Sequence, residues 1–344
     1  MRREASVMLV GLIASALAFL CGDARAQDVA DFFRGRTINL ILSAGEGGGY
    51  SSYARAFAPT FAQHIPGKPN VIVQNMPGGG GIRAMNYLFT QAPKDGTTLG
   101  LPHSSVPFAP LYGMKGAQFD PRQAHWLGSL ATATGICVAW GNSGIRTWQD
   151  MLDKEYVVGG TGAGSQMETM PSALKQLYGA RIKVISGYKG GNDVYLAMER
   201  GEVHGRCGGL MSSIQSTRPD WFAKRMVNVP IQIALERSRM FPDVPSLGEM
   251  TKDDRTRQIM QLLLAPDHMD RSVFAPPGVP AERVAALRVA FANAFKDPAF
   301  AEEARRVRIE IDYVSGEDVA KIVARSFSMP SEIVEAAKQS IGGM

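Results

Sequence analysis

Two glycine-rich loops, one in each half of the chain, most constrain what this sequence can fold into. The first, SAGEGGGYSS at 43–52, follows the apolar run 38–42 and precedes an amphipathic stretch. The second, GGTGAGS at 159–165, follows the apolar run 156–158. A strand, a glycine loop and a helix in succession direct free backbone N–H groups and a positive helix end toward one point, which suits an anion. Two such units predict an anionic or polar ligand held between two halves.

The first half alternates strand-like and helix-like segments. Tyr53, Phe57, Phe61 and Ile65 recur at a spacing of four, which places them on one face of a helix. The expected elements are a strand at 36–42, a helix at 50–64, a strand at 71–75, a helix after 81 and a strand at 97–101. This βαβαβ order predicts a parallel sheet covered by helices.

A second β/α series follows a strand expected at 136–140, which leaves the first half. Its expected elements are strands at 156–158, 182–186 and 203–207, with helices at 166–178 and 192–200. Toward the end of the chain, residues 272–275 precede a proline-rich segment at 276–280, and we expect helices at 281–296, 298–307 and 316–338. The chain is therefore expected to be an α/β protein with two sheets.

Residues 1–26 have the features of a signal peptide. Arg2 and Arg3 precede an apolar stretch at 7–20, and Ala24-Arg25-Ala26 has the small-x-small pattern of a cleavage site. We expect cleavage after Ala26 and export to the periplasm. A lipoprotein would use Cys21, but the preceding leucine is a poor fit for lipid attachment. No second long apolar run follows.

The charge pattern argues against a nucleic-acid partner. The formal net charge is +5, but the basic residues are scattered, and the run at 305–308 follows two glutamates. Such a run is typical of a solvated helix face. The histidines are isolated from one another, so we expect no metal site and no cofactor. After cleavage two cysteines remain, Cys137 and Cys207. They either form a disulfide, as exported pairs do, or are two small buried strand residues.

Seven short sequence motifs along the chain together indicate a family resemblance. They are GGG at 47–49, QNMPGGGG at 74–81, APKDGTTL at 92–99, GAGS at 162–165, GYKGG at 187–191, FPDVPS at 241–246 and APPGVP at 275–280. In order and spacing the chain resembles the exported solute-binding receptors of tripartite tricarboxylate transporters, often called the Bug family.

The resemblance implies a two-lobed clamshell of the periplasmic-binding-protein (Venus flytrap) type, type II-like, in which each lobe is a doubly wound sheet with helices on both faces. Residues 27–135 and 270–344 would form lobe 1 and residues 136–269 lobe 2, with the hinge near 134–140 and 268–276. It also implies a monomer that binds a small organic acid or related polar molecule and delivers it to membrane transporter subunits. Such a receptor has no catalytic residue and is not an enzyme.

Family ligands are mostly small carboxylates held by backbone N–H groups and hydroxyls of these loops. His103 is added because it ends the third strand beside two serines, where it would hydrogen-bond either a carboxylate or water. The candidate ligand-binding residues are Ser43, Glu46, Gly47, Gly48, Gly49, Tyr50, Ser51, His103, Ser104, Ser105, Thr161, Gly162, Ser165, Tyr188 and Gly190. For Ser165, capping of the following helix is an alternative compatible role.

Glu46 departs from the family pattern, which has a proline region there, and Ser51 stands where an aspartate is usual. A glutamate near the pocket would repel a second carboxylate unless it were protonated or turned outward. This raises the prospect of a monocarboxylate, an amide or an amine-bearing ligand.

Two other functions compete with transport. A receptor with the same clamshell could dock a signalling partner when closed, and the sequence does not separate the two. The other alternative is an exported hydrolase, because Ser172 and Lys175 match the Ser-x-x-Lys pair of some acylating enzymes. The companion motifs of that pair are absent, which disfavours it.

Overall fold

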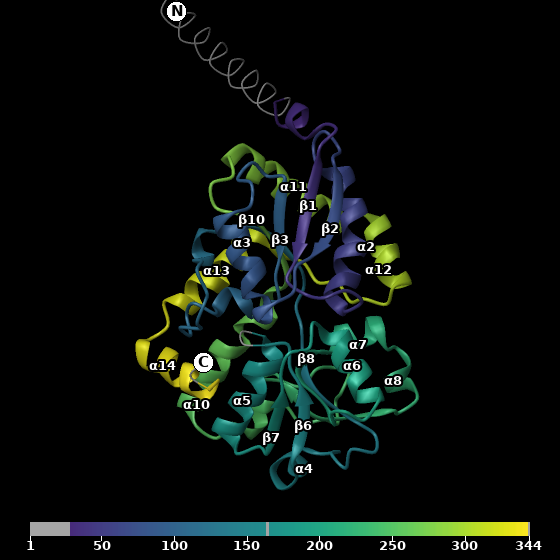
Figure 1. The fold of residues 1–344 in the computed structure, drawn as a ribbon, viewed down its shortest axis with the longest axis vertical. Helices are drawn as coiled ribbons and strands as arrows, with labels where there is room; N and C mark the ends of the chain where they lie inside the picture. The colour runs from purple at the N-terminus through teal and green to yellow at the C-terminus, as the bar shows by residue number, and fades with distance from the viewer. Residues whose placement is uncertain (1–27, 163–164, 343–344) are drawn as a thin grey trace, which may run out of the picture.

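The chain forms two lobes, stacked along its long axis, each built on one β-sheet with helices on both faces (Figure 1). This computed structural model describes residues 28–162 and 165–342, so the signal peptide expected at 1–26 lies outside the described residues. The two-sheet α/β architecture expected from the sequence is confirmed. No helix in the described part of the chain has the length and apolar character needed to cross a membrane.

The sheet of the first lobe is mixed. Its order is β11-β4-β10-β3-β1-β2, formed by β1 (Thr37–Leu42), β2 (Asn70–Asn75), β3 (Thr98–Leu101), β4 (His125–Ala131), β10 (Asp270–Ala275) and β11 (Val314–Ser315). β1 pairs in parallel with both β2 and β3, as the βαβαβ pattern predicts. β10 and β4 join antiparallel beside them, and the sequence had not indicated β4.

Helices cover both faces of this sheet. On one side lie α2 (Gly49–His64), α11 (Ala281–Lys296) and α12 (Pro298–Arg306), and on the other α3 (Ile82–Thr90) and α13 (Gly316–Phe327). The apolar face expected on α2 is confirmed, because Tyr53, Phe57, Phe61 and Ile65 are all buried. The Phe57 ring lies 4.8 Å from that of Phe291, between ring centres, which joins α2 to α11.

The sheet of the second lobe has the order β7-β6-β8-β5-β9. Its strands are β5 (Gly135–Trp140), β6 (Tyr156–Gly159), β7 (Ile182–Ile185), β8 (Gly205–Leu210) and β9 (Val227–Ile233). Its helices are α4 (Trp148–Asp153), α5 (Gln166–Tyr178), α6 (Gly191–Glu199), α7 (Met211–Thr217), α8 (Asp220–Ala223), α9 (Leu247–Met250) and α10 (Asp254–Leu264).

Short 3-10 helices also occur along the chain. Between β2 and β4 of the first sheet lie η1 (Gly79–Gly81), η2 (Val106–Phe108) and η3 (Pro121–Gln123), and between α10 and β10 lies η4 (Ala265–Met269).

The chain passes from the first sheet to the second between β4 and β5, and returns between β9 and β10. The two crossing segments meet where the Ala133 N–H donates to the Asp267 carbonyl at 2.8 Å. The lobe and hinge boundaries given above remain predictions.

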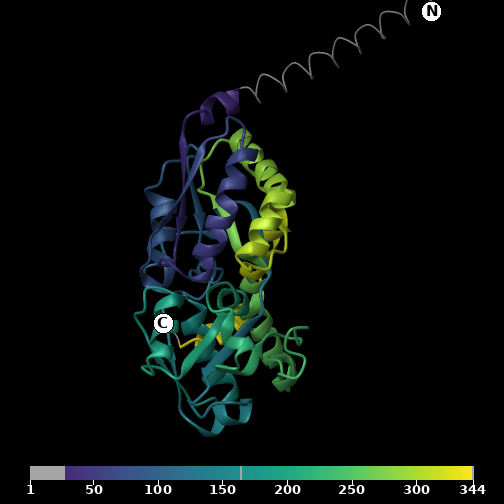
Figure 2. The ribbon, with the colours of Figure 1, turned by 90° about the vertical axis from the view of Figure 1, so that its right-hand side faces the viewer.

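The single helix expected at 316–338 is two helices. α13 ends at Phe327, and α14 (Ser331–Ser340) begins after Pro330. Proline lacks a backbone N–H and disfavours helical geometry in the residue before it, so it separates the helices here. α14 then packs against α5 and α10, which places the end of the chain against the second lobe (Figures 1 and 2).

Candidate functional site

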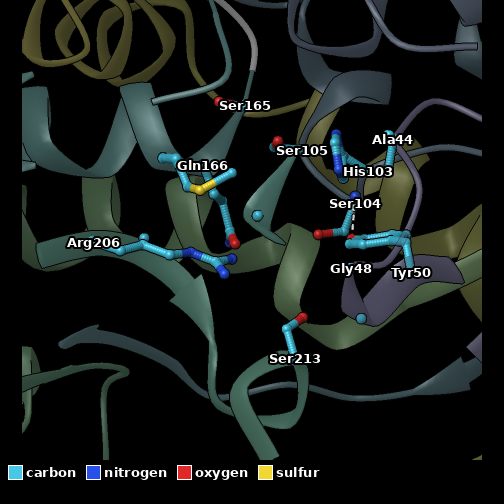
Figure 3. A pocket seen from close by; sticks show the side chains of 15 residues that line it. Ala44, Gly48, Tyr50, His103, Ser104, Ser105, Ser165, Gln166, Arg206 and Ser213 are labelled. Carbon is cyan, nitrogen blue, oxygen red and sulfur yellow. Dashed lines mark hydrogen bonds between the residues drawn. The ribbon is translucent and has the colours of Figure 1, made fainter. Parts of the chain in front are cut away.

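Residues of both lobes border a cavity of about 40 Å³ where the lobes face each other (Figure 3). The first lobe contributes Ala44, Gly45, Gly48, Gly49, Tyr50, His103, Ser104 and Ser105. The second contributes Ser165, Gln166, Met167, Gly191, Arg206, Gly208 and Ser213. Of the candidate ligand-binding residues, those that line this cavity are Gly48, Gly49, Tyr50, His103, Ser104, Ser105 and Ser165.

Three helices begin at the edge of this cavity. Gly48 precedes α2, Ser165 precedes α5, and Gly191 is the first residue of α6. The N-terminus of a helix presents unpaired backbone N–H groups and a partial positive charge. The cavity is therefore bordered by helix ends that favour an anion. Two of these ends lie at the glycine-rich loops 43–52 and 159–165, and the third lies at the segment 187–191.

Tyr50 organises the wall of the first lobe. Its hydroxyl donates to Asp270 Oδ1 at 2.7 Å and accepts from the Ser104 N–H at 3.0 Å. Ser43 Oγ accepts from the His103 N–H at 2.7 Å. These bonds fix the 103–105 segment, which follows β3 at the carboxyl end of the parallel strands. Ser43 thus positions the wall from behind and does not line the cavity.

His103 presents a neutral ring to the cavity. Burial lowers the pKa of its imidazole to about 4, and the charges of Arg206 and Arg271 act in the same direction, while a hydrogen bond with the Gly80 backbone opposes them. Its Nδ1 is buried and has no hydrogen-bond partner within the described residues. The ring lies edge-on to Tyr50, with 4.6 Å between centres. At neutral pH this histidine supplies a hydrogen-bonding nitrogen without a charge.

A buried ion pair lies behind Tyr50 and links the lobes. Arg271 pairs with Asp270, and both side chains are fully buried. The Arg271 guanidinium lies 4.2 Å from the centre of the Tyr50 ring and 4.4 Å from that of Tyr53. Its Nη2 donates to Ser213 Oγ of α7 at 2.9 Å. The positive charge of Arg271 is therefore matched by Asp270, and the pair holds α7 against the first lobe.

Arg206 forms the opposite wall and was not selected from the sequence. It lies on β8, is only 5% exposed, and points between the lobes toward the Tyr50 side (Figure 3). One guanidinium nitrogen donates to the Tyr195 hydroxyl of α6. Its Nε has no hydrogen-bond partner in the described part of the chain.

Ser165 faces the same cavity. It occupies the position before α5, yet its hydroxyl makes no capping hydrogen bond and has no partner among the described residues. The capping role considered from the sequence is therefore not seen at the level of the side chain. Its hydroxyl instead borders the cavity beside the start of α5.

Gln166 connects the cavity wall to the crossing segments. Its amide donates to Asp267 Oδ1 in η4. Burial raises the pKa of Asp267 to about 7, although the Gln166 hydrogen bond and the Arg271 charge act in the opposite direction. The Asp267 carboxyl therefore changes its charge near neutral pH.

The remaining candidates lie beside the cavity and do not line it. Glu46 and Gly47 are exposed. Ser51 Oγ donates to the Gly45 carbonyl at 3.3 Å, which braces the loop. Thr161, Gly162, Tyr188 and Gly190 lie in the second-lobe loops outside the lining set, and residues 163 and 164 fall outside the described residues.

The two lobes touch across the cavity. The Gly45 N–H donates to the Lys189 carbonyl at 3.2 Å, joining the first glycine loop to the second lobe. A side-chain carbon added at Gly49 would lie 2.7 Å from Ser213 Cα, so glycine is required for this approach. The structure is therefore a closed form of the clamshell.

Cys137 and Cys207 lie opposite each other on the neighbouring strands β5 and β8 and are joined as a disulfide. Both are fully buried. Because Cys207 follows Arg206 directly, the bond fixes the strand that carries this arginine. Among the described residues no group of three or more His, Cys, Asp or Glu could hold a metal ion.

Comparison with known proteins agrees with the geometry. The pattern of the family described as "Tripartite tricarboxylate transporter family receptor" matches residues 54–338. The chain belongs to this receptor family. The family resemblance stated from the sequence is confirmed, and the family is one of solute-binding receptors.

Individual relatives of this receptor are distant. It is 26% identical over 345 residues to a Cupriavidus necator protein named "UPF0065 protein in gbd 5'region", covering 97% of this chain and 98% of that one. The structure of the periplasmic binding protein BugD aligns with a TM-score of 0.70 at 18% identity, covering 89% and 97% of the two chains. MatC from Rhodopseudomonas palustris with bound malate aligns with a TM-score of 0.67 at 18% identity, covering 87% and 99%. These structural matches establish the two-lobed periplasmic-binding-protein fold.

Proposed function

We propose that this receptor binds a small carboxylate in the interlobe cavity and delivers it to a tripartite tricarboxylate-type membrane transporter. The observation that carries the proposal is the convergence of the N-termini of α2, α5 and α6, from two lobes, on one cavity. Backbone N–H groups at helix ends bind anionic oxygens without a dedicated charged partner.

The donors around the cavity are sufficient for a useful affinity. Hydrogen bonds to a charged group contribute about 1.5–3 kcal/mol each. Ser165 Oγ borders the cavity without a protein partner among the described residues, and the backbone N–H groups at the starts of α2, α5 and α6 add further donors. A few such bonds, after the cost of ordering, support binding near 1 μM, which corresponds to about 8 kcal/mol.

Opening and closing of the lobes gives the ligand access. The contacts between Gly45 and Lys189 and between Arg271 and Ser213 join the lobes in the closed form. A ligand that contacts both walls gains interactions only when the lobes close, so it shifts the population toward the closed form. Closure then presents a distinct surface to the transporter.

The family supports the transport role and export to the periplasm, and the malate found in MatC is an example of a carboxylate in this fold. We expect the receptor to act as a monomer that needs no cofactor and performs no reaction.

A thermal-shift screen of residues 27–344, followed by isothermal titration, tests the proposal. The panel contains dicarboxylates, aliphatic and aromatic monocarboxylates, amides and amines. A ligand that binds only the folded state raises the melting temperature by mass action. Saturable one-to-one binding of a carboxylate supports the proposal. Binding of amines or amides alone, with no response to any carboxylate, contradicts it.

A further inference from the structure

Two buried arginines lie at or near the cavity, and only one of them is paired with a carboxylate of the protein. This difference affects which carboxylate ligand is favoured. Arg206 is a buried cation, and no carboxylate in the described part of the chain pairs with it. Arg271, the other buried arginine nearby, is neutralised by Asp270. A buried charge without a partner is costly, so a ligand that supplies one opposite charge is favoured.

The neighbours of Arg206 hold its guanidinium in a fixed position. A side-chain carbon at Gly191 would lie 3.0 Å from its Nη1, and one at Gly209 would lie 2.1 Å from its Nε. Two glycines therefore leave the space in which the guanidinium lies. Tyr195 holds one nitrogen, which aims the rest of the group. A guanidinium fixed in this way binds a carboxylate through directed hydrogen bonds.

Among the described residues that line the cavity, Arg206 is the one side chain with a full positive charge, so a second carboxylate would have no second cation to pair with. His103, on the facing wall, is neutral at physiological pH because burial depresses its pKa to about 4. Beside the second-lobe loop lies Glu168, only 9% exposed, whose Oε1 accepts from the Gly162 N–H at 2.9 Å and from Ser186 Oγ at 2.6 Å. This carboxylate uses loop donors and adds negative charge at that end of the cleft.

We infer that Arg206 is the specificity-determining residue and that it selects a ligand with a single negative charge, a monocarboxylate, over dicarboxylates and uncharged amides. The inference rests on the proposed function and deepens it. The carboxylate lies against Arg206 and the helix ends of the second lobe. The uncharged end of the ligand faces Tyr50, His103 and the two serines that follow it.

Two matched sets of probes test this with the mature protein and isothermal titration. Lactate, lactamide and malate share a 2-hydroxy acid skeleton and differ in charge. Benzoate, benzamide and terephthalate form the larger set. Within the set that binds, we expect the monocarboxylate to bind at least tenfold more tightly than both of its partners.

Arg206→Gln tests the residue itself. It removes the charge and keeps a polar side chain, so the monocarboxylate should lose about 100-fold in affinity, as expected when one partner of a buried charge pair is removed. The preference for the monocarboxylate over its amide should fall to near one, an effect that a merely structural role would not produce. The control Arg200→Gln removes an exposed arginine of the same lobe and should keep both the affinity and the preference.

The outcomes separate the two claims. If malate or terephthalate binds as tightly as the monocarboxylate, the inference is wrong and the carboxylate receptor stands. The inference also falls if Arg206→Gln keeps the wild-type preference. If no carboxylate of either set or of the wider panel binds, the proposed function itself is wrong. Because the wild-type ratio of affinities needs no variant, a folding defect in Arg206→Gln does not leave the inference untested.

Discussion

Replacing Gly49 by alanine tests whether the receptor closes through the contact between α2 and α7. The added Cβ would lie 2.4 Å from Ser213 Oγ and 2.7 Å from Ser213 Cα, whereas ordinary contact begins at 3.4 Å. The second lobe must therefore move back by several tenths of an ångström. Overpacking of this kind costs about 1–3 kcal/mol. The cost falls on the closed form alone, because the atoms that clash belong to the other lobe.

Ligand affinity should consequently fall by about 5–150-fold, since each 1.4 kcal/mol corresponds to a factor of ten. Isothermal titration with the ligand found in the screen measures this loss. Small-angle X-ray scattering at saturating ligand should show a more open particle than the wild type. The melting temperature without ligand should not fall, because the three atoms nearest to the added Cβ all belong to Ser213 of the second lobe. Arg55→Ala, on the exposed face of α2, is the control and should bind as the wild type does. Wild-type affinity and compactness in Gly49→Ala would refute closure through this contact.

Three further predictions follow from buried groups. Folding raises the pKa of Asp267 to about 7, so its contribution to stability is complete below about pH 4 and is lost as the pH rises through 7. The unfolding free energy of Asp267→Asn, measured in urea, should therefore rise relative to that of the wild type between pH 5 and pH 8, by at most about 1.4 kcal/mol per pH unit. Because both proteins contain His103, its opposite pH trend cancels when the two free energies are subtracted. An equal difference between variant and wild type at pH 5 and pH 8 would contradict the prediction. Ser165→Ala should weaken carboxylate binding about tenfold or more without changing the melting temperature, because the hydroxyl borders the cavity and caps nothing; unchanged affinity in titration removes it from the site. Replacing Cys137 and Cys207 by alanine should lower the unfolding free energy by about 4 kcal/mol, given the sequence separation of 70 residues; two free thiols in the unreduced, denatured mature protein would show that no disulfide forms.

The helices with strong end signals were predictable from the sequence. The helix expected at 166–178 has those bounds in the structure, and Gly179 ends it with a positive φ of 75°. The helix at 281–296 lies between Pro280 and the Asp297-Pro298 pair. The break before Pro330 was also visible in principle, since a proline inside a helical pattern is a standard stop signal.

The site was less predictable, because it depends on how two lobes meet. The serines and glycines at helix starts could be selected from their local pattern, whereas Arg206 could not. Basic residues are usually exposed, and the residues around Arg206 show no clear alternation. The glycines at 205, 208 and 209 were a usable signal, because glycines within a strand often mark close approach by another group. Glu46 is the opposite case. It lies within the first glycine-rich loop and was selected for that reason, yet its side chain is exposed and does not line the cavity.

The most direct test of the central claim is a crystal structure of the mature protein with the tightest-binding carboxylate of the screen. The account predicts closed lobes with the ligand between them, and its carboxylate within hydrogen-bonding distance of Arg206 and the start of α5. A ligand bound outside the interlobe cavity, or one whose carboxylate lies away from Arg206 and from the helix ends, would contradict it.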